Sequence, residues 1–139
     1  MAIATFLQLL RPRTIEDQHA QRVYRGHVVE AVGQIRQTFN NWVALRQIEP
    51  DYARLANTAA VNRWELMRLV ERIDRLQPPR ALNSAHRAML TTVTASARAC
   101  QLLAVGYRFH KSEAICDGQA LLLETVHDLD DLIVRVDAS

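Results

Sequence analysis

The chain has 139 residues, of which 49% are hydrophobic, 23% charged and 6% aromatic. This composition is typical of one soluble globular domain and excludes a disordered or collagen-like segment. Two cysteines, Cys100 and Cys116, are too few for a disulfide framework and fit a protein kept reduced in the cytoplasm. We therefore predict a single cytoplasmic domain over residues 1–139.

The four prolines occur at only three places, Pro12, Pro50 and the pair Pro78 and Pro79. They leave stretches of 37, 27 and 60 residues without proline. A β-sandwich or β-barrel needs turn signals roughly every 8 to 12 residues, so this spacing favours long helices.

The N-terminal region predicts one short helix followed by a long one. Residues 2–10 are apolar but lack the basic start and the small-residue cleavage site of a secretory signal, so we expect a minor helix there. Thr14, followed by Glu16 and Asp17, carries the pattern of a helix N-terminus. It predicts a long helix over 14–48.

The long helix shows apolar residues spaced three or four apart, as one face of a helix requires. They are Tyr24, Val28, Ala31 or Val32, Ile35, Phe39 and Trp42. Gly26 and Gly33 interrupt good helix formers, and we expect them to permit close helix approach, with a bend as the alternative.

Two further helices are separated by prolines. Pro50 ends the long helix, and Asp51 is placed to cap a helix over 51–77. Pro78 and Pro79 form a linker before a helix over 81–109. Their inward residues are Tyr52, Leu55, Ala59, Leu66, Leu69, Ile73 and Leu76 in the first, and Leu82, Met89, Val93, Ala97, Cys100, Leu103 or Ala104, and Tyr107 in the second.

The last helix is predicted over 112–136, beginning at Ser112, with Gly118 as a possible interruption of its first turns. Its inward residues are Ile115, Leu122, Val126, Leu129, Ile133 and Val136. The helix before it contains many Thr, Ser and Ala residues between 91 and 99, and such small side chains let neighbours come close. We therefore expect the 81–109 helix to be central or the most tightly packed.

These elements predict an all-α fold, an antiparallel four-helix bundle with a short extra N-terminal helix. Charge is divided unevenly along it: residues 1–112 carry +8 and residues 113–139 carry −6, which together give the net charge of +2. We expect the acidic last helix to lie among basic neighbours, either its own or those of a partner.

Two pairs of residues invite a binding-site interpretation. Glu124 and His127 resemble the Glu-x-x-His motif of ferritin-like di-iron bundles over four residues, but both lie opposite their own apolar stripe and no second such motif exists. His86 and Asn62 are the polar members of two core stripes. They are the candidate residues for a metal, haem or small-ligand site, but one histidine alone does not bind zinc. We favour for His86 a neutral core imidazole that is hydrogen-bonded to a buried partner such as Asn62 or a backbone carbonyl.

Other function classes lack a supporting motif. There is no Gly-x-Ser-x-Gly sequence, no glycine-rich phosphate loop and no convergent acid, base and nucleophile, so we expect no enzyme, no catalytic residues, no metal and no cofactor. No uncharged run approaches the roughly 20 residues of a membrane span, so we expect no membrane partner. The 16 arginines are dispersed, which disfavours nucleic acid, and their excess over one lysine fits a GC-rich bacterial genome.

Surplus apolar surface gives the best functional indication. On the second long helix, Met67, Ala60 and Trp64 lie about 100°, 120° and 160° from the centre of the core stripe. An exposed patch with a large aromatic residue usually marks an interface. We therefore predict a non-enzymatic bundle that acts by self-association, as a homodimer, or as an adaptor or subunit of a larger assembly, with Trp64, Met67 and Ala60 in the contact. The alternative is the ligand-binding bundle with its site near His86.

Overall fold

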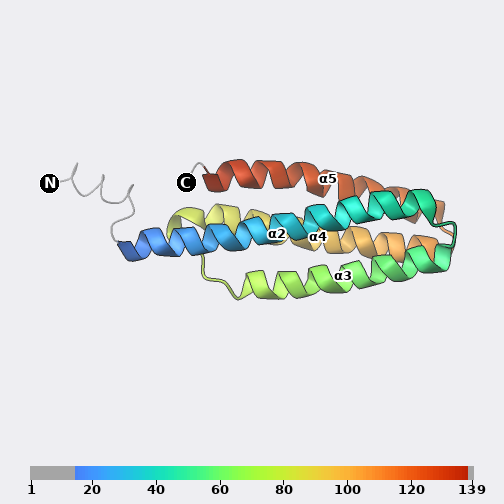
Figure 1. The fold of residues 1–139 in the computed structure, drawn as a ribbon, viewed down its shortest axis with the longest axis horizontal. Helices are drawn as coiled ribbons and strands as arrows, with labels where there is room; N and C mark the ends of the chain where they lie inside the picture. The colour runs from blue at the N-terminus through green and yellow to red at the C-terminus, as the bar shows by residue number, and fades with distance from the viewer. Residues whose placement is uncertain (1–14, 138–139) are drawn as a thin grey trace.

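The computed structural model describes residues 15–137, which form an all-α antiparallel helical bundle (Figure 1). Its helices are α2 (Ile15–Ile48), α3 (Tyr52–Asp74), α4 (Asn83–Arg108) and α5 (Ser112–Asp137), with a 3₁₀ turn, η1 (Arg80–Leu82), before α4. The predicted bundle is confirmed, and the four long helices agree with the predicted ranges to within a few residues. The predicted helix over 2–10 and the capping residue Thr14 lie outside the described residues.

Local signals fix the connections between helices. The Asp51 carboxylate accepts a hydrogen bond from the backbone N–H of Ala53 at 2.9 Å, so it caps α3 as predicted. At the end of α4, His110 adopts a left-handed conformation with φ of 53°, and the N–H of Lys111 bonds to the carbonyl of Gly106 at 2.8 Å. This hydrogen bond, from an N–H five residues further along the chain, closes a Schellman turn, which redirects the chain into α5.

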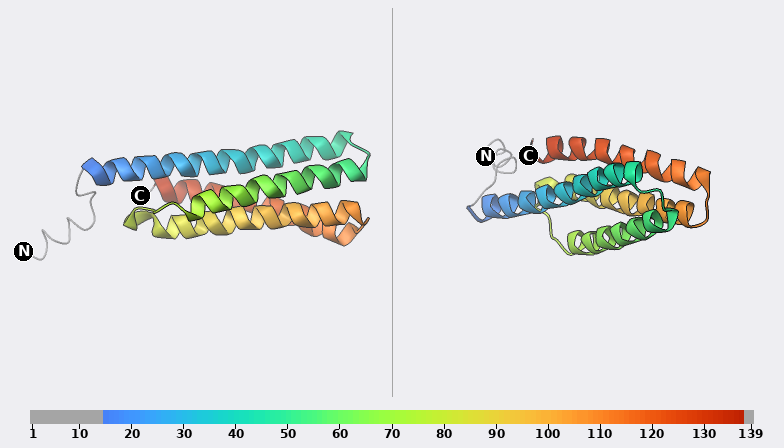
Figure 2. Two further views of the ribbon diagram at one scale, coloured as in Figure 1. Left: turned by 90° about the horizontal axis from the view of Figure 1, so that it is seen from below. Right: turned by 45° about the vertical axis from the view of Figure 1, so that its right-hand side comes forward.

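α4 lies in a layer between α3 and α5, and α2 runs lengthwise along one side of this layer, nearer to α3 and α5 than to α4. α4 packs closely against α3 on one side and α5 on the other, whereas α2 makes sparser approaches to all three (Figures 1 and 2). α2 is attached by large side chains near both ends: the Tyr24 ring contacts His86 and the Trp42 ring contacts Tyr107 of α4. The prediction that the third long helix is central and the most tightly packed is therefore confirmed.

Most predicted core residues are buried, but α5 is rotated from its expected orientation. Val126 and Ile133 are only half-buried, whereas Thr125 and Leu132 are fully buried beside Leu122 and Leu129. The rotation turns α5 toward α4, where small residues allow a close approach. Other departures are the half-burial of Phe39, Leu76 and Ile115 and the exposure of Tyr52, which stacks on His110; the side chain of Val136 lies outside the described residues.

Two pairs of glycines have opposite environments. A Cβ added at Gly26 or Gly33 of α2 would meet nothing within 4 Å, so the prediction that they permit close helix approach is wrong. A Cβ at Gly106 would lie 2.7 Å from Cγ1 and 2.8 Å from the backbone N of Ile115, and one at Gly118 would lie 2.8 Å from Cγ of Leu103. The close approach that requires glycine is therefore between α4 and α5, and Gly118 does not interrupt α5.

The segment Arg80–Arg108, which comprises η1 and α4, is long and apolar enough by length and composition to cross a membrane. The expectation from uncharged runs missed it because arginines divide the segment. In the bundle this helix is the central one, and it buries Thr92 and Ser96 together with its apolar residues. A core helix that is covered by neighbours has the same composition as a weak membrane span.

α2 extends beyond its partners, as its predicted length requires. It has 34 residues against 23, 26 and 26 in α3, α4 and α5, and residues 15–20 of its first turns are all exposed. Further along, Arg36 pairs with Asp130 of α5 and Arg72 of α3 pairs with Glu30 at 3.5 Å. One acidic residue of α5 therefore has a basic neighbour within the chain, as the charge pattern predicts.

Candidate interaction surface

The layer formed by α3, α4 and α5 has two faces with different surroundings. α2 covers one face, and within residues 15–137 no helix covers the opposite one (Figures 1 and 2). We call this opposite surface the open face. It is formed by the outward residues of α4 and by the adjoining edges of α3 and α5, and two grooves run along it.

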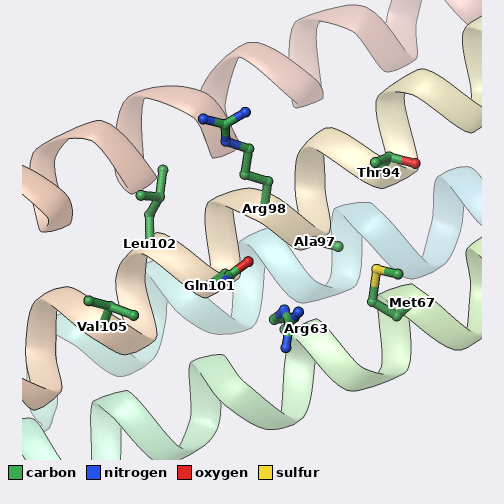
Figure 3. A pocket seen from close by; sticks show the side chains of 8 residues that line it. All are labelled: Arg63, Met67, Thr94, Ala97, Arg98, Gln101, Leu102 and Val105. Carbon is green, nitrogen blue, oxygen red and sulfur yellow. The ribbon is translucent and has the colours of Figure 1, made fainter.

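The first groove lies between α3 and α4 and has a volume of about 520 Å³. Figure 3 shows Arg63 and Met67 on α3 and a row of residues from Thr94 to Val105 on α4, with the α2 ribbon on the far side. Ala97, a small and almost fully buried residue, forms part of its floor. An apolar floor between arginines suits an amphipathic or acidic surface.

The second groove lies between α4 and α5 and has a volume of about 750 Å³. Asp117 and Leu121 line it from α5, and Thr91 and Ala95 are among the residues that line it from α4. The two grooves share Thr94, Arg98 and Leu102. They therefore lie side by side at the same height, separated by one ridge of α4.

The predicted interface residues lie along the α3 edge of the open face. Met67 lines the first groove and is 38% exposed, and Trp64, about 60° further round the helix, is 59% exposed. Ala60 is half-buried one turn before Trp64. The Arg68 guanidinium lies 4.8 Å from the centre of the Trp64 ring, a cation–π contact on the surface of α3. Trp64 and Met67 are therefore exposed near each other on α3, whereas Ala60 packs against the core.

His86, the candidate ligand residue, is buried with a protein partner already in place. Its Nδ1 lies 2.5 Å from the Tyr24 hydroxyl, a contact between α4 and α2. Burial lowers the pKa of His86 and outweighs the opposing effect of the Asp74 carboxylate, and burial raises the pKa of Tyr24 to about 12. Both groups are therefore neutral at pH 7, and the pair is a polar link within the core.

Asn62, the other candidate ligand residue, is half-buried on α3 and is not the hydrogen-bonding partner of His86. We had expected Asn62 or a backbone carbonyl in that role. Tyr24 was predicted as a core residue only, because nothing in the sequence relates the register of α2 to that of α4 across 62 residues. The ligand-binding alternative stays a prediction.

The remaining titratable residues are dispersed. Glu124 and His127 are both exposed, as their helical phase predicts. Burial raises the pKa of the Cys100 thiol to about 12, which keeps it protonated, and Cys116 is exposed on α5. The part of the chain that the structure describes contains no group of three or more His, Cys, Asp or Glu residues arranged to hold a metal ion.

Sequence reasoning identified Trp64 and Met67 as lying outside the core stripe of α3 but did not identify the grooves. Arg63 and Arg98 were read only as dispersed surface charge, yet both line the first groove. Their spacing on two separate helices carries no local signal, because it depends on how α3 and α4 pack. No known protein family, functionally curated protein or solved structure matches the chain.

Proposed function

We propose that the protein acts by association rather than by catalysis, with the open face as its interface and a second copy of the chain as its partner. The observation that carries the proposal is the exposure of Met67, which lines the first groove, and of Trp64 near it, on a face that no described helix covers. Aromatic residues at the edge of a groove are typical anchors of protein interfaces.

The size of the open face supports a stable interface. Three helices side by side, each about 9 Å across and about 35 to 39 Å long, present on the order of 1,000 Å². A standard interface buries about 800 Å² on each partner. The face is therefore large enough for a dimer without a contribution from α2.

The charges of the open face support a second copy as the partner. Arg63 and Arg98 border the first groove, and Asp117 borders the second. One surface thus carries both signs, which is what a symmetric pair of identical surfaces requires. An adaptor role in a larger assembly remains compatible with the same face, and a wild-type mass well above two chains would indicate it.

The test is the mass of the purified protein in solution, measured by size-exclusion chromatography with light scattering. We expect about twice the 15.8 kDa of one chain for the wild type and a monomer for Trp64→Asp. Val29→Asp is the matched control, because Val29 is an exposed apolar residue of α2, away from the open face, and we expect it to leave the mass unchanged. A monomeric wild type, or a dimer unaffected by Trp64→Asp, would refute the proposal.

The proposed location is the cytoplasm, which the free thiols of Cys100 and Cys116 support. Cys116 is exposed on α5, so a thiol reagent can reach it. Labelling in freshly lysed cells tests the location, and a protein recovered with Cys116 already oxidised would contradict it.

A further inference from the structure

The structure also indicates how two copies would be oriented, an inference that rests on the proposed association through the open face. The first observation concerns the positions of the two grooves along the bundle. Because the two grooves share Thr94, Arg98 and Leu102, the α3 residue Arg63 and the α5 residue Asp117 lie at the same height on opposite sides of α4.

The second element is the charge of the two edges. α3, residues 52–74, carries four arginines against three acidic residues, and the charged residue with which it lines the first groove is Arg63. Residues 112–137, which form α5, carry one arginine against seven acidic residues, and Asp117 lines the second groove. The α5 edge of the open face is therefore strongly acidic and the α3 edge presents Arg63, and like charges placed opposite each other in an interface are unfavourable.

The third element is symmetry. Two identical faces that meet about a two-fold axis have two limiting orientations, with the axis across the helices or parallel to them. An axis across the helices places α5 against α5 of the second copy, acid against acid. An axis parallel to the helices places α3 of each copy against α5 of the other and keeps every residue at its own height.

We propose that the protein forms a two-fold dimer whose axis runs parallel to its helices, so that the Arg63 edge of each copy lies on the Asp117 edge of the other. Trp64 and Met67 of one copy then face Leu121 of its partner copy, since these residues flank the same section of α4. The contact between an α3 edge and an α5 edge therefore occurs twice in the dimer, once on each side of the axis.

The centre of the open face suits this arrangement. α4 of one copy meets α4 of the other along Thr91, Thr94 and Ala95, whose small side chains allow close approach. Arg98 extends from α4 toward α5 (Figure 3). A two-fold axis parallel to α4 sends the two Arg98 side chains in opposite directions, which keeps like charges apart.

Charge reversal tests the orientation. We expect Arg63→Asp alone and Asp117→Arg alone each to raise the dimer dissociation constant by about tenfold or more in sedimentation equilibrium. An equimolar mixture of the two variants should associate about as tightly as the wild type, because both cross-copy pairs then have opposite charges. Arg22→Asp, on α2, is the control and should leave the constant unchanged; circular dichroism verifies that each variant is folded.

The outcomes separate this inference from the proposed function. A wild type that is monomeric overturns both. A wild type that dimerises and is disrupted by Trp64→Asp supports the open face as the interface. If Arg63→Asp and Asp117→Arg then leave the dissociation constant unchanged, or if their mixture fails to recover it, the parallel axis is wrong while the interface stands.

Discussion

Helices α2 and α4 both bury one side in the bundle, but they contact their neighbours in different ways. α4 packs through small residues such as Ala97 and Ala99, and its backbone comes close to those of α3 and α5. α2 is held at a greater separation by large side chains, among them Tyr24, Ile35 and Trp42. The distance between two packed helices depends on the side chains between them. A contact made by small residues should therefore be intolerant of an added methyl group, whereas the outer side of α2 should accept one.

The largest effect that tests this comparison is expected at the contact between α4 and α5. Gly106→Ala would place a methyl group 2.8 Å from the backbone N of Ile115, which cannot move without shifting α5. Overpacking of this kind costs about 1–3 kcal/mol, and we expect that loss in the free energy of unfolding, measured by urea titration at a fixed protein concentration. Gly118→Ala meets the side chain of Leu103 and the carbonyl of Ala99 and should behave in the same way. Unchanged unfolding midpoints for both variants would show that α5 is not held as closely as described.

A smaller effect is expected where α2 meets α4, at Tyr24 and His86. Because burial lowers the pKa of His86 below its ordinary value of 6.5, the unfolded chain binds a proton more readily than the folded one. The contribution to stability is therefore fully present above pH 6.5 and is lost as the pH falls below it. We expect the wild type to lose more stability than His86→Gln between pH 7.5 and pH 5.5, measured as the change in urea midpoint.

Tyr24→Phe is the control for this pH dependence. It removes the hydroxyl group that lies 2.5 Å from His86 Nδ1 but keeps the imidazole buried, so its stability should still fall at low pH. If the wild type and His86→Gln lose the same amount of stability between pH 7.5 and pH 5.5, then His86 titrates alike in the folded and unfolded chain.

The sequence was sufficient for the helices but not for their mutual arrangement. Pro50, Asp51 and the pair Pro78 and Pro79 act within a turn or two of the chain, so the helix boundaries could be predicted from local chemistry. The central position of α4 followed from its small residues. By contrast, four apolar stripes do not say which helices are neighbours, and only the packed structure shows α4 between α3 and α5 with α2 on the opposite side.

The same distinction, between what one helix determines and what the packing of helices determines, applies to the residues of the candidate site. Trp64 could be placed outside the core from helical phase alone, since phase is a property of one helix. The pairing of Tyr24 with His86 and the presence of Arg63 and Arg98 in the lining of one groove depend on register between helices. The error at Gly26 and Gly33 was avoidable, because both lie about 160° to 180° from Ile35 on the helix and phase already placed them outward.

These two glycines provide the smallest and most selective test of the comparison. Gly26→Ala and Gly33→Ala add a methyl group to exposed positions of α2 where nothing lies within 4 Å. Alanine is favoured over glycine in a helix interior by about 0.8–1.0 kcal/mol. Each variant should therefore raise the free energy of unfolding by up to about 1 kcal/mol, the opposite sign to Gly106→Ala, in the same urea titration. Because neither position lies on the open face, the dimer dissociation constant should not change. A loss of stability at Gly26 or Gly33 would mean that α2 uses its outer side for a close contact, and the distinction between the two helices would then fail.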